Sequence, residues 1–329
     1  MRKWIALAVA GGLVVSACSG GAGATTTIPS PPPVPATTSA PGTTPPPPHT
    51  TTTTSSTTTT SAPTTTSSTT TTTTVPPPPP GVSDVTLTVG AASRRYTLYV
   101  PPEAASGPVP LVLDFHGFTS DPDRYDRQNA MRAQATAAGF ALAQPAANLI
   151  GNAWDPFAGS PDVEFGLAVI ADVSARLAVD RVFASGFSNG GALAARIACD
   201  APGALTAIGI VSAAHFGWAV CERTEPIPVL AFHGTADRVV PYEGAGSVLP
   251  PVEGWSAQWA AGNGCSDSAT EVITDDVDRL SWTGCRAAVA LYRIRDGGHA
   301  WPGPPNDLFF DTTDSISATE LIWQFFASQ

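Results

Sequence analysis

A serine lies at the centre of the pentapeptide Gly186-Phe187-Ser188-Asn189-Gly190. The apolar run before it predicts a strand, and the alanine-rich run after it predicts a helix. Glycines on both sides allow the tight turn at this junction, because larger side chains would collide with the strand and the helix. Such a turn, a nucleophile elbow, exposes the serine hydroxyl at a helix N-terminus. The pentapeptide therefore predicts a nucleophilic serine.

A serine nucleophile needs a base to take its proton and a carboxylate to orient that base. Both partners are expected later in the chain, each in a loop that follows a strand. Asp237 follows the apolar run 228–233, and His299 lies in a glycine-rich loop after the apolar run 289–294. Either residue alone is more often a turn former or a surface side chain. Their order behind the elbow predicts a triad of Ser188, His299 and Asp237.

Acyl transfer also needs two N–H groups that bind the developing oxyanion. One is expected from the backbone of Asn189, and the other from the loop after the third strand. His116-Gly117-Phe118 lies at that place, so the second predicted donor is the N–H of Phe118, with that of Gly117 as the alternative. His116 and His233 each end an apolar run before a glycine, and we interpret both as structural.

The elements that position these residues are predicted within one domain, residues 81–329. Alternating residues at 85–89 and 95–100 predict an antiparallel pair of edge strands. Continuous apolar runs predict parallel strands near 111–115, 140–145, 181–186, 206–212, 228–233 and 287–294. Helices are expected between them, including one that starts at Pro161 and runs to about 178 and a last one near 317–328. This order predicts an α/β fold with a mostly parallel, doubly wound sheet and helices on both faces.

The N-terminus predicts export. Met1-Arg2-Lys3 precedes an apolar run too short to cross a bilayer, as in a secretory signal peptide. Val15-Ser16-Ala17-Cys18 resembles the lipobox of bacterial lipoproteins, which implies cleavage before Cys18 and lipidation of its thiol. We therefore expect a signal peptide over residues 1–18 and an anchor on the outer face of the cell membrane or in the cell envelope. Ordinary signal cleavage and secretion are the alternative.

Residues 19–80 are nearly all Thr, Ser, Pro, Ala and Gly. Such a composition cannot bury a core, so this segment is predicted to be a disordered linker. Its proline tracts favour an extended polyproline II chain, and its many Ser and Thr residues suggest O-glycosylation. The linker would hold the folded domain away from the membrane, which the protein is expected to meet only through the lipid anchor.

Four cysteines remain in the predicted domain: Cys199, Cys221, Cys265 and Cys285. An even number in an exported domain indicates two disulfides, and three pairings are open. Pairing neighbours, Cys199 with Cys221 and Cys265 with Cys285, would close two loops of roughly twenty residues, each worth about 3 kcal/mol. None shows zinc-ligand spacing, so no metal site is expected.

The formal net charge is −11, and Lys3 is the only lysine. No basic stripe or row of stacked aromatics is present, so nucleic acid is not an expected partner. Trp154 and Trp301 are candidates for lining a substrate pocket, although packing beneath long loops is an equally good interpretation.

Three segments together resemble a known family. They are residues 179–191, which hold the elbow; His233-Gly234-Thr235-Ala236-Asp237; and His299-Ala300-Trp301-Pro302-Gly303. They are similar to the polyhydroxybutyrate depolymerase/feruloyl esterase group of secreted α/β-hydrolases. The resemblance implies the α/β-hydrolase fold, a serine esterase without cofactor, a triad at the residues named above and a disulfide between Cys265 and Cys285. Many depolymerases have Cys where this chain has Phe118, which favours a soluble or polysaccharide-linked ester.

The expected function is therefore ester hydrolysis through an acyl-enzyme. The substrate would be a hydroxyalkanoate-type, feruloyl or acetyl ester, either as a small molecule or as part of an oligomer or polymer. Two alternatives remain open. The same triad serves serine peptidases of the prolyl-peptidase type, and an idle hydrolase fold could act as a surface binding module.

Overall fold

The computed structural model describes residues 78–102, 104, 107–213, 221, 225–246, 248–304 and 311–329. The predicted signal peptide, Cys18 and nearly all of the predicted linker lie outside these residues. Among the helices of the described ranges, none has the length and apolar character needed to cross a bilayer.

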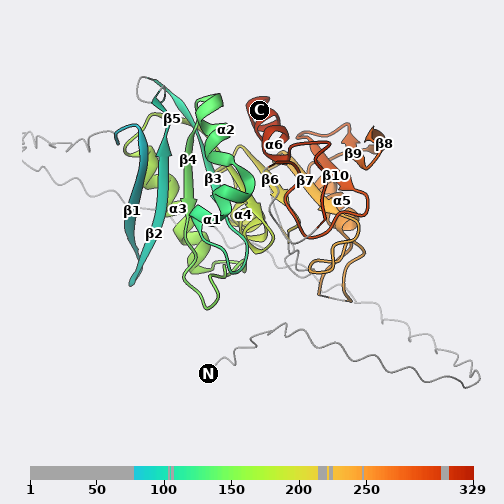
Figure 1. The fold of residues 1–329 in the computed structure, drawn as a ribbon, viewed down its shortest axis with the longest axis horizontal. Coiled ribbons are helices and arrows are strands. Elements are labelled where there is room, and N and C mark those ends of the chain that lie inside the picture. The colour runs from blue at the N-terminus through green and yellow to red at the C-terminus, as the bar shows by residue number, and fades with distance from the viewer. Residues whose placement is uncertain are drawn as a thin grey trace, which may run out of the picture. The chain divides into compact units, whose positions relative to one another are not determined.

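A single sheet of ten strands forms the centre of the domain (Figure 1). Its spatial order is β1-β2-β4-β3-β5-β6-β7-β10-β9-β8. The six strands from β4 to β10 in this order pair in parallel, and the strands outside them pair antiparallel. The strands are β1 (Gly81–Val89), β2 (Ala92–Val100), β3 (Val109–Phe115), β4 (Ala141–Pro145), β5 (Val179–Phe187), β6 (Ala207–Val211), β7 (Val229–Gly234), β8 (Asp267–Thr274), β9 (Val277–Thr283) and β10 (Val289–Ile294).

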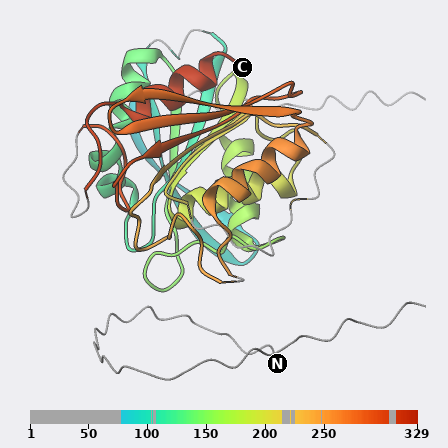
Figure 2. The same ribbon diagram turned by 90° about the vertical axis from the view of Figure 1, so that its right-hand side faces the viewer.

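Helices cover both faces of the sheet. One face packs against α1 (Pro122–Asn129), α2 (Met131–Ala138) and α6 (Ala318–Ala327). The other packs against α3 (Pro161–Ser174), α4 (Asn189–Asp200) and α5 (Val252–Gly262). Figure 2 shows α5 and α6 on opposite sides of the sheet. The predicted mostly parallel sheet with helices on both faces is confirmed.

Each parallel strand contributes to two hydrophobic cores, one on each face. In β7, Val229 and Ala231 belong to the core beneath α3, α4 and α5, whereas Leu230 and Phe232 belong to the core beneath α6. Successive side chains of a strand point to opposite faces. A strand covered on both faces must therefore be apolar throughout, which explains the continuous apolar runs of the sequence.

Local signals fix where helices begin and end. The side chains of Ser160 and Ser317 accept hydrogen bonds from backbone N–H groups three residues later, at the starts of α3 and α6. Helix α3 ends at Ser174, earlier than the predicted 178. The carbonyl of Ala178 already accepts a hydrogen bond from the N–H of Val109 at the start of β3, so the chain must be extended there.

The sequence predicts no strands between α5 and β10, where the structure has the hairpin β8–β9. Strand β9 pairs antiparallel with β10, and β8 pairs antiparallel with β9, so the hairpin extends the sheet by two strands. The residues of β8 are exposed over most of their length. Without a buried face, they lack the alternation of apolar and polar residues that marks a strand in a sequence.

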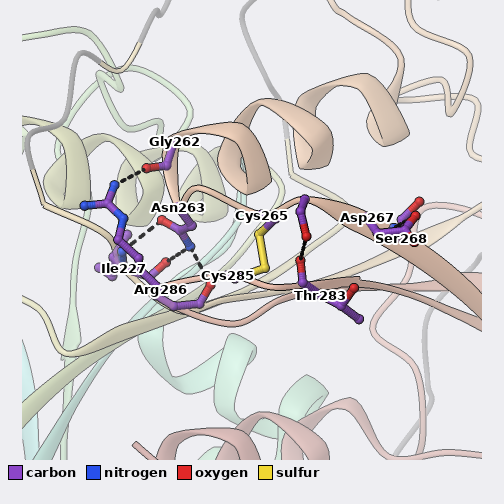
Figure 3. Close-up of a disulfide and its surroundings, with 11 residues drawn as sticks. Ile227, Gly262, Asn263, Cys265, Asp267, Ser268, Thr283, Cys285 and Arg286 are labelled. Carbon is purple, nitrogen blue, oxygen red and sulfur yellow. Dashed lines mark hydrogen bonds between the residues drawn. A yellow bond between two sulfur atoms is a disulfide. The ribbon is translucent and has the colours of Figure 1, made fainter.

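Both predicted disulfides are present, Cys199–Cys221 and Cys265–Cys285. Figure 3 shows the second one joining the segment after α5 to the chain that leaves β9. Beside it, the buried amide of Asn263 donates to the carbonyl oxygens of Ile227 and Ala287. The arginine Arg286 donates to the carbonyl oxygen of Gly262. These bonds hold the base of the hairpin in place. Two disulfides are typical of a protein outside the reducing cytosol.

Candidate active site

The turn between β5 and α4 has the geometry of a nucleophile elbow. Ser188 has φ 53° and ψ −121°, a left-handed conformation that is strained for a residue with a side chain. A Cβ on Gly190 would lie 2.2 Å from the carbonyl oxygen of Phe115, and one on Gly186 would lie 2.6 Å from the backbone of Gly190. Glycine is therefore required on both sides of the serine, as the sequence predicted.

Asp237 and His299 lie together. The Nδ1 of His299 is 2.8 Å from Oδ2 of Asp237, and both side chains are nearly buried. The other carboxylate oxygen, Oδ1, accepts hydrogen bonds of 2.8 Å from the backbone N–H groups of Val239 and Val240. Since a carboxylate only accepts, Nδ1 of His299 carries a proton, and in the neutral imidazole Nε2 is then the acceptor. This is the tautomer that a general base requires.

The carboxylate of Asp237 is held in its charged form. Burial alone would raise its pKa, but hydrogen bonds from His233 and His299, the charge of His299 and the N–H of Val240 together lower the pKa well below its usual range. A charged carboxylate can stabilise the imidazolium that forms when His299 takes a proton.

The loops of Asp237 and His299 also contact each other. The N–H of Ala236 donates to the carbonyl oxygen of Gly297, and a Cβ on Gly234 would lie 2.1 Å from that same oxygen. The ring of His299 packs on that of Phe187, directly before Ser188, with centroids 4.9 Å apart. Strands β5, β7 and β10 are parallel, so their carboxyl ends lie at the same edge of the sheet. Ser188, Asp237 and His299 come after these strand ends and therefore lie at that edge.

The loop that follows β3 lies against the elbow. A Cβ on Gly117 would lie 2.9 Å from the ring of Phe187, and one on Gly190 would lie 2.4 Å from the carbonyl oxygen of His116. Among the hydrogen bonds of the described residues, none is donated by the backbone N–H of Phe118 or of Asn189. Both N–H groups are thus available to a ligand, and the Phe118 side chain is 58% exposed.

His116 supports this loop as a neutral imidazole. Burial lowers its pKa, Nδ1 lies 2.8 Å from the carbonyl oxygen of Gly117, and Nε2 accepts from the N–H of Ala147. The carbonyl oxygen of His116 accepts from the indole N–H of Trp154. These contacts agree with the structural role expected for this histidine.

The two tryptophans proposed for a substrate pocket are buried packing residues. Trp154 packs on Phe115 and His116. Trp301 packs on Tyr125, and its indole N–H donates to Thr319. Each is only 2% exposed, so the structure favours the packing interpretation.

Two roles were missed by sequence reasoning. The side chain of Asn189 makes two hydrogen bonds with the backbone of Trp154, to its N–H and its carbonyl oxygen, so the elbow and the loop after β4 are linked. His233 lies beside the carboxylate of Asp237, with Nε2 3.3 Å from Oδ2. The only signal for the second contact was the four-residue spacing of these two residues.

Within the described part of the chain, no group of three or more His, Cys, Asp or Glu side chains could hold a metal ion. The site combines a strained serine at a helix N-terminus, an oriented imidazole with a charged carboxylate and two unoccupied backbone N–H groups. These parts are suited to acyl transfer.

Residues 94–237 match the family model described as Esterase PHB depolymerase. The matched range contains Ser188 and ends at Asp237, so the assignment of His299 depends on the hydrogen bond described above.

Similar proteins are named as esterases. The chain is 29% identical over 266 residues to "Putative esterase NocK" of Nocardia uniformis subsp. tsuyamanensis, covering 68% of this chain and 76% of that protein. It is 27% identical over 244 residues to "Probable feruloyl esterase C" of Aspergillus niger, covering 71% and 83%. Among solved structures, an acetyl xylan esterase from Aspergillus awamori superposes with a TM-score of 0.53 at 16% identity, covering 67% of this chain and 94% of that one. This likeness shows the shared α/β-hydrolase fold.

Proposed function

The chain belongs to the PHB depolymerase/feruloyl esterase-like family and is a carboxylic ester hydrolase, and from this premise we propose that it acts through an acyl-enzyme formed on Ser188. The main support is the buried hydrogen bond between His299 and Asp237, on the sheet edge where β5 ends in the elbow. The turn of Asp237 is bonded through Oδ1, so the contact of Oδ2 with His299 is not needed to form that turn.

In the proposed mechanism, the hydroxyl oxygen of Ser188 attacks the ester carbonyl while Nε2 of His299 takes the hydroxyl proton. The N–H groups of Asn189 and Phe118 bind the oxyanion of the tetrahedral intermediate. His299 then gives its proton to the leaving alcohol, and the acyl group stays on Ser188. Water, deprotonated by His299, hydrolyses this acyl-enzyme and restores the serine.

Replacing the nucleophile tests this mechanism. Ser188→Ala is expected to lower kcat for p-nitrophenyl butyrate by about 10⁶-fold, because the serine and the base act as a unit. Ser268→Ala, in the exposed strand β8, is the matched control and should keep full activity. A fluorophosphonate should label the wild-type protein and the control but not the Ser188 variant. Undiminished turnover by Ser188→Ala would overturn the proposal.

The surroundings of the site suggest an apolar substrate. Phe118, Leu149 and Ile150 are exposed hydrophobic residues on the loops after β3 and β4, and we refer to them as the apolar lip. The two loops are joined, because the N–H of Thr119 donates to the carbonyl oxygen of Gly151 and the Phe118 ring covers that glycine. An exposed apolar surface beside two oxyanion donors fits an ester with a bulky aromatic or aliphatic acyl group better than an acetyl ester.

A panel of acetyl, butyryl, feruloyl and hydroxybutyrate-oligomer esters tests this substrate class. The residue to change is Ile150, which is 99% exposed and has no packing role to lose. Ile150→Ser should raise KM for the feruloyl ester by about tenfold and leave the acetyl ester unchanged. The control is Val272→Ser in β8. Equal effects of Ile150→Ser on both esters would exclude the apolar lip as the acyl contact.

We also propose export with lipidation of Cys18. Two disulfides in the domain support export, and the lipobox-like segment supports the anchor. The wild-type protein should fractionate with membranes and incorporate a radiolabelled fatty acid, whereas Cys18→Ser should do neither. Equal membrane association of both would exclude this anchor.

A further inference from the structure

We propose that His233 is a positioning residue of the triad. It would hold the turn that carries Asp237 and present a second N–H to the carboxylate oxygen that receives His299. This inference rests on the proposed function. It assigns a role to a histidine that the sequence indicated only as structural.

The contacts of His233 fix its tautomer. Its Nε2 lies 2.8 Å from the carbonyl oxygen of Val240, and a carbonyl oxygen can only accept a hydrogen bond. Nε2 therefore carries a proton. The same nitrogen lies 3.3 Å from Oδ2 of Asp237, so the proton that it donates to Val240 is also close to the carboxylate. Oδ2 is the oxygen that also receives Nδ1 of His299.

These contacts close a small ring around the carboxylate. The N–H of Val240 donates to Oδ1 of Asp237, while the carbonyl of Val240 accepts from His233. His233 is therefore bonded to the residue that orients the carboxylate as well as lying beside the carboxylate itself. The histidine is in β7, whose pairing with β6 and β10 makes it a rigid support. The lowered pKa of Asp237 agrees with this, since His233 is among its causes.

His116 provides an internal comparison. Both histidines follow a buried Phe at the end of a parallel strand and precede Gly. Yet His116 is satisfied by backbone groups of Gly117 and Ala147. A buried strand-end histidine in this fold thus needs no carboxylate, so the contact between His233 and Asp237 is not a requirement of burial.

The experiment compares two replacements of His233. Gln places an amide N–H near the position of Nε2 and keeps the donor, whereas Leu removes it. Removing an N–H that lies beside a charged carboxylate should make His233→Leu slower in kcat by about 10- to 100-fold, with KM within about twofold of wild type. His233→Gln should restore most of kcat. Rates are expressed per site labelled to completion by a fluorophosphonate, so that misfolded protein does not count.

A second readout separates positioning from structural support. The proton on Nδ1 of His299, which is hydrogen-bonded to Asp237, should give a downfield proton NMR signal. This signal should shift or broaden in His233→Leu and return in His233→Gln. In His116→Leu, which loses an equivalent buried histidine, the signal should keep its wild-type position.

An unchanged kcat and an unchanged proton signal in His233→Leu would overturn the inference. If that variant does not fold, Gln and Asn replace the pair, because Asn is too short to reach Val240. Equal kcat values for His233→Gln and His233→Asn would then overturn it. Activity that survives Ser188→Ala would instead refute the proposed function, so the two failures are distinguishable.

Discussion

Two buried carboxylates, one within β3 and one after β7, have opposite electrostatic surroundings. Asp237 follows β7 and accepts hydrogen bonds from two backbone N–H groups; its two histidine neighbours and the N–H of Val240 lower its pKa. Asp114 lies within β3, completely buried, and faces the neutral side chains of Ser185, Asn129 and Gln144. Burial raises the pKa of Asp114 to about 6, although the three hydrogen bonds oppose the change.

The difference shows that burial alone does not set the charge of a carboxylate. Three neutral donors do not offset the desolvation of Asp114, whereas donors on histidines and on the backbone offset that of Asp237. The two sites accordingly suit different purposes. The charged Asp237 can stabilise an imidazolium. The hydrogen bonds of Asp114 connect β3, β4, β5 and the end of α1 into one framework.

The largest expected effect is on catalysis and tests whether only one of the carboxylates takes part. Asp237→Asn should lower kcat by about 10⁴-fold, because an amide no longer selects the tautomer of His299 that acts as a base. Asp114→Asn should change kcat by less than about tenfold, since Asp114 contacts none of the triad residues. Kinetics with p-nitrophenyl butyrate measure both. Comparable losses of kcat in the two variants would contradict the prediction that only Asp237 takes part in catalysis.

The next effect is on stability and tests the charge of Asp114. Its pKa of about 6 lies above the value of about 3.9 expected in the unfolded chain. The folded protein therefore binds the proton more tightly, and its stability falls as the pH rises from about 4 to about 6. The full penalty above pH 6 is about 3 kcal/mol, of which about 2 kcal/mol develops between pH 4 and pH 7.

Urea unfolding with intact disulfides measures this penalty. The free energy of unfolding of Asp114→Asn, relative to wild type, should rise by about 2 kcal/mol between pH 4 and pH 7. Asp237 has a lowered pKa, so its contribution is present above about pH 4 and is lost at lower pH. The relative stability of Asp237→Asn should therefore stay nearly constant between pH 5 and pH 7. A flat curve for both variants would mean that Asp114 is ionised like Asp237.

The smallest expected effect concerns a polar link between the two regions. Thr319 accepts from the indole N–H of Trp301 and donates to the carbonyl oxygen of Asn129, whose side chain binds Asp114. Trp301 is two residues after His299. Thr319→Val would leave the buried indole N–H unpaired and should cost about 1–3 kcal/mol of stability. We expect kcat to fall by less than about tenfold, and a loss like that of Asp237→Asn would show that the framework controls the triad.

The sequence predicted the parallel strands and the order of the triad because both leave local patterns. The elbow needs glycine at fixed positions, and strands buried on both faces need continuous apolar runs. The hairpin β8–β9 left no such pattern, since most of β8 is exposed. The short helix α1 was also hard to find, because the residues that it buries include Gln128 and Asn129.

Side-chain roles were predictable only where the backbone dictates them. A tryptophan side chain is large and apolar, so it is expected to be covered by other atoms. The sequence does not tell whether a substrate or the protein core covers Trp154 and Trp301. The two His-Gly pairs look equivalent along the chain. They differ because the turn after β7 folds Asp237 and Val240 back onto His233, whereas the loop after β3 brings Gly117 to His116.

The strand order also has a consequence for when the site comes into existence. Ser188 is available once β5 and α4 are made, but His299 can reach Asp237 only after β10 has paired with β7. Strand β10 is the last strand among the described residues, and α6 is the element described after it. During synthesis and export, the protein would therefore be inactive until almost its whole length has emerged. Its esterase activity would then indicate that the last parallel strand has joined the sheet.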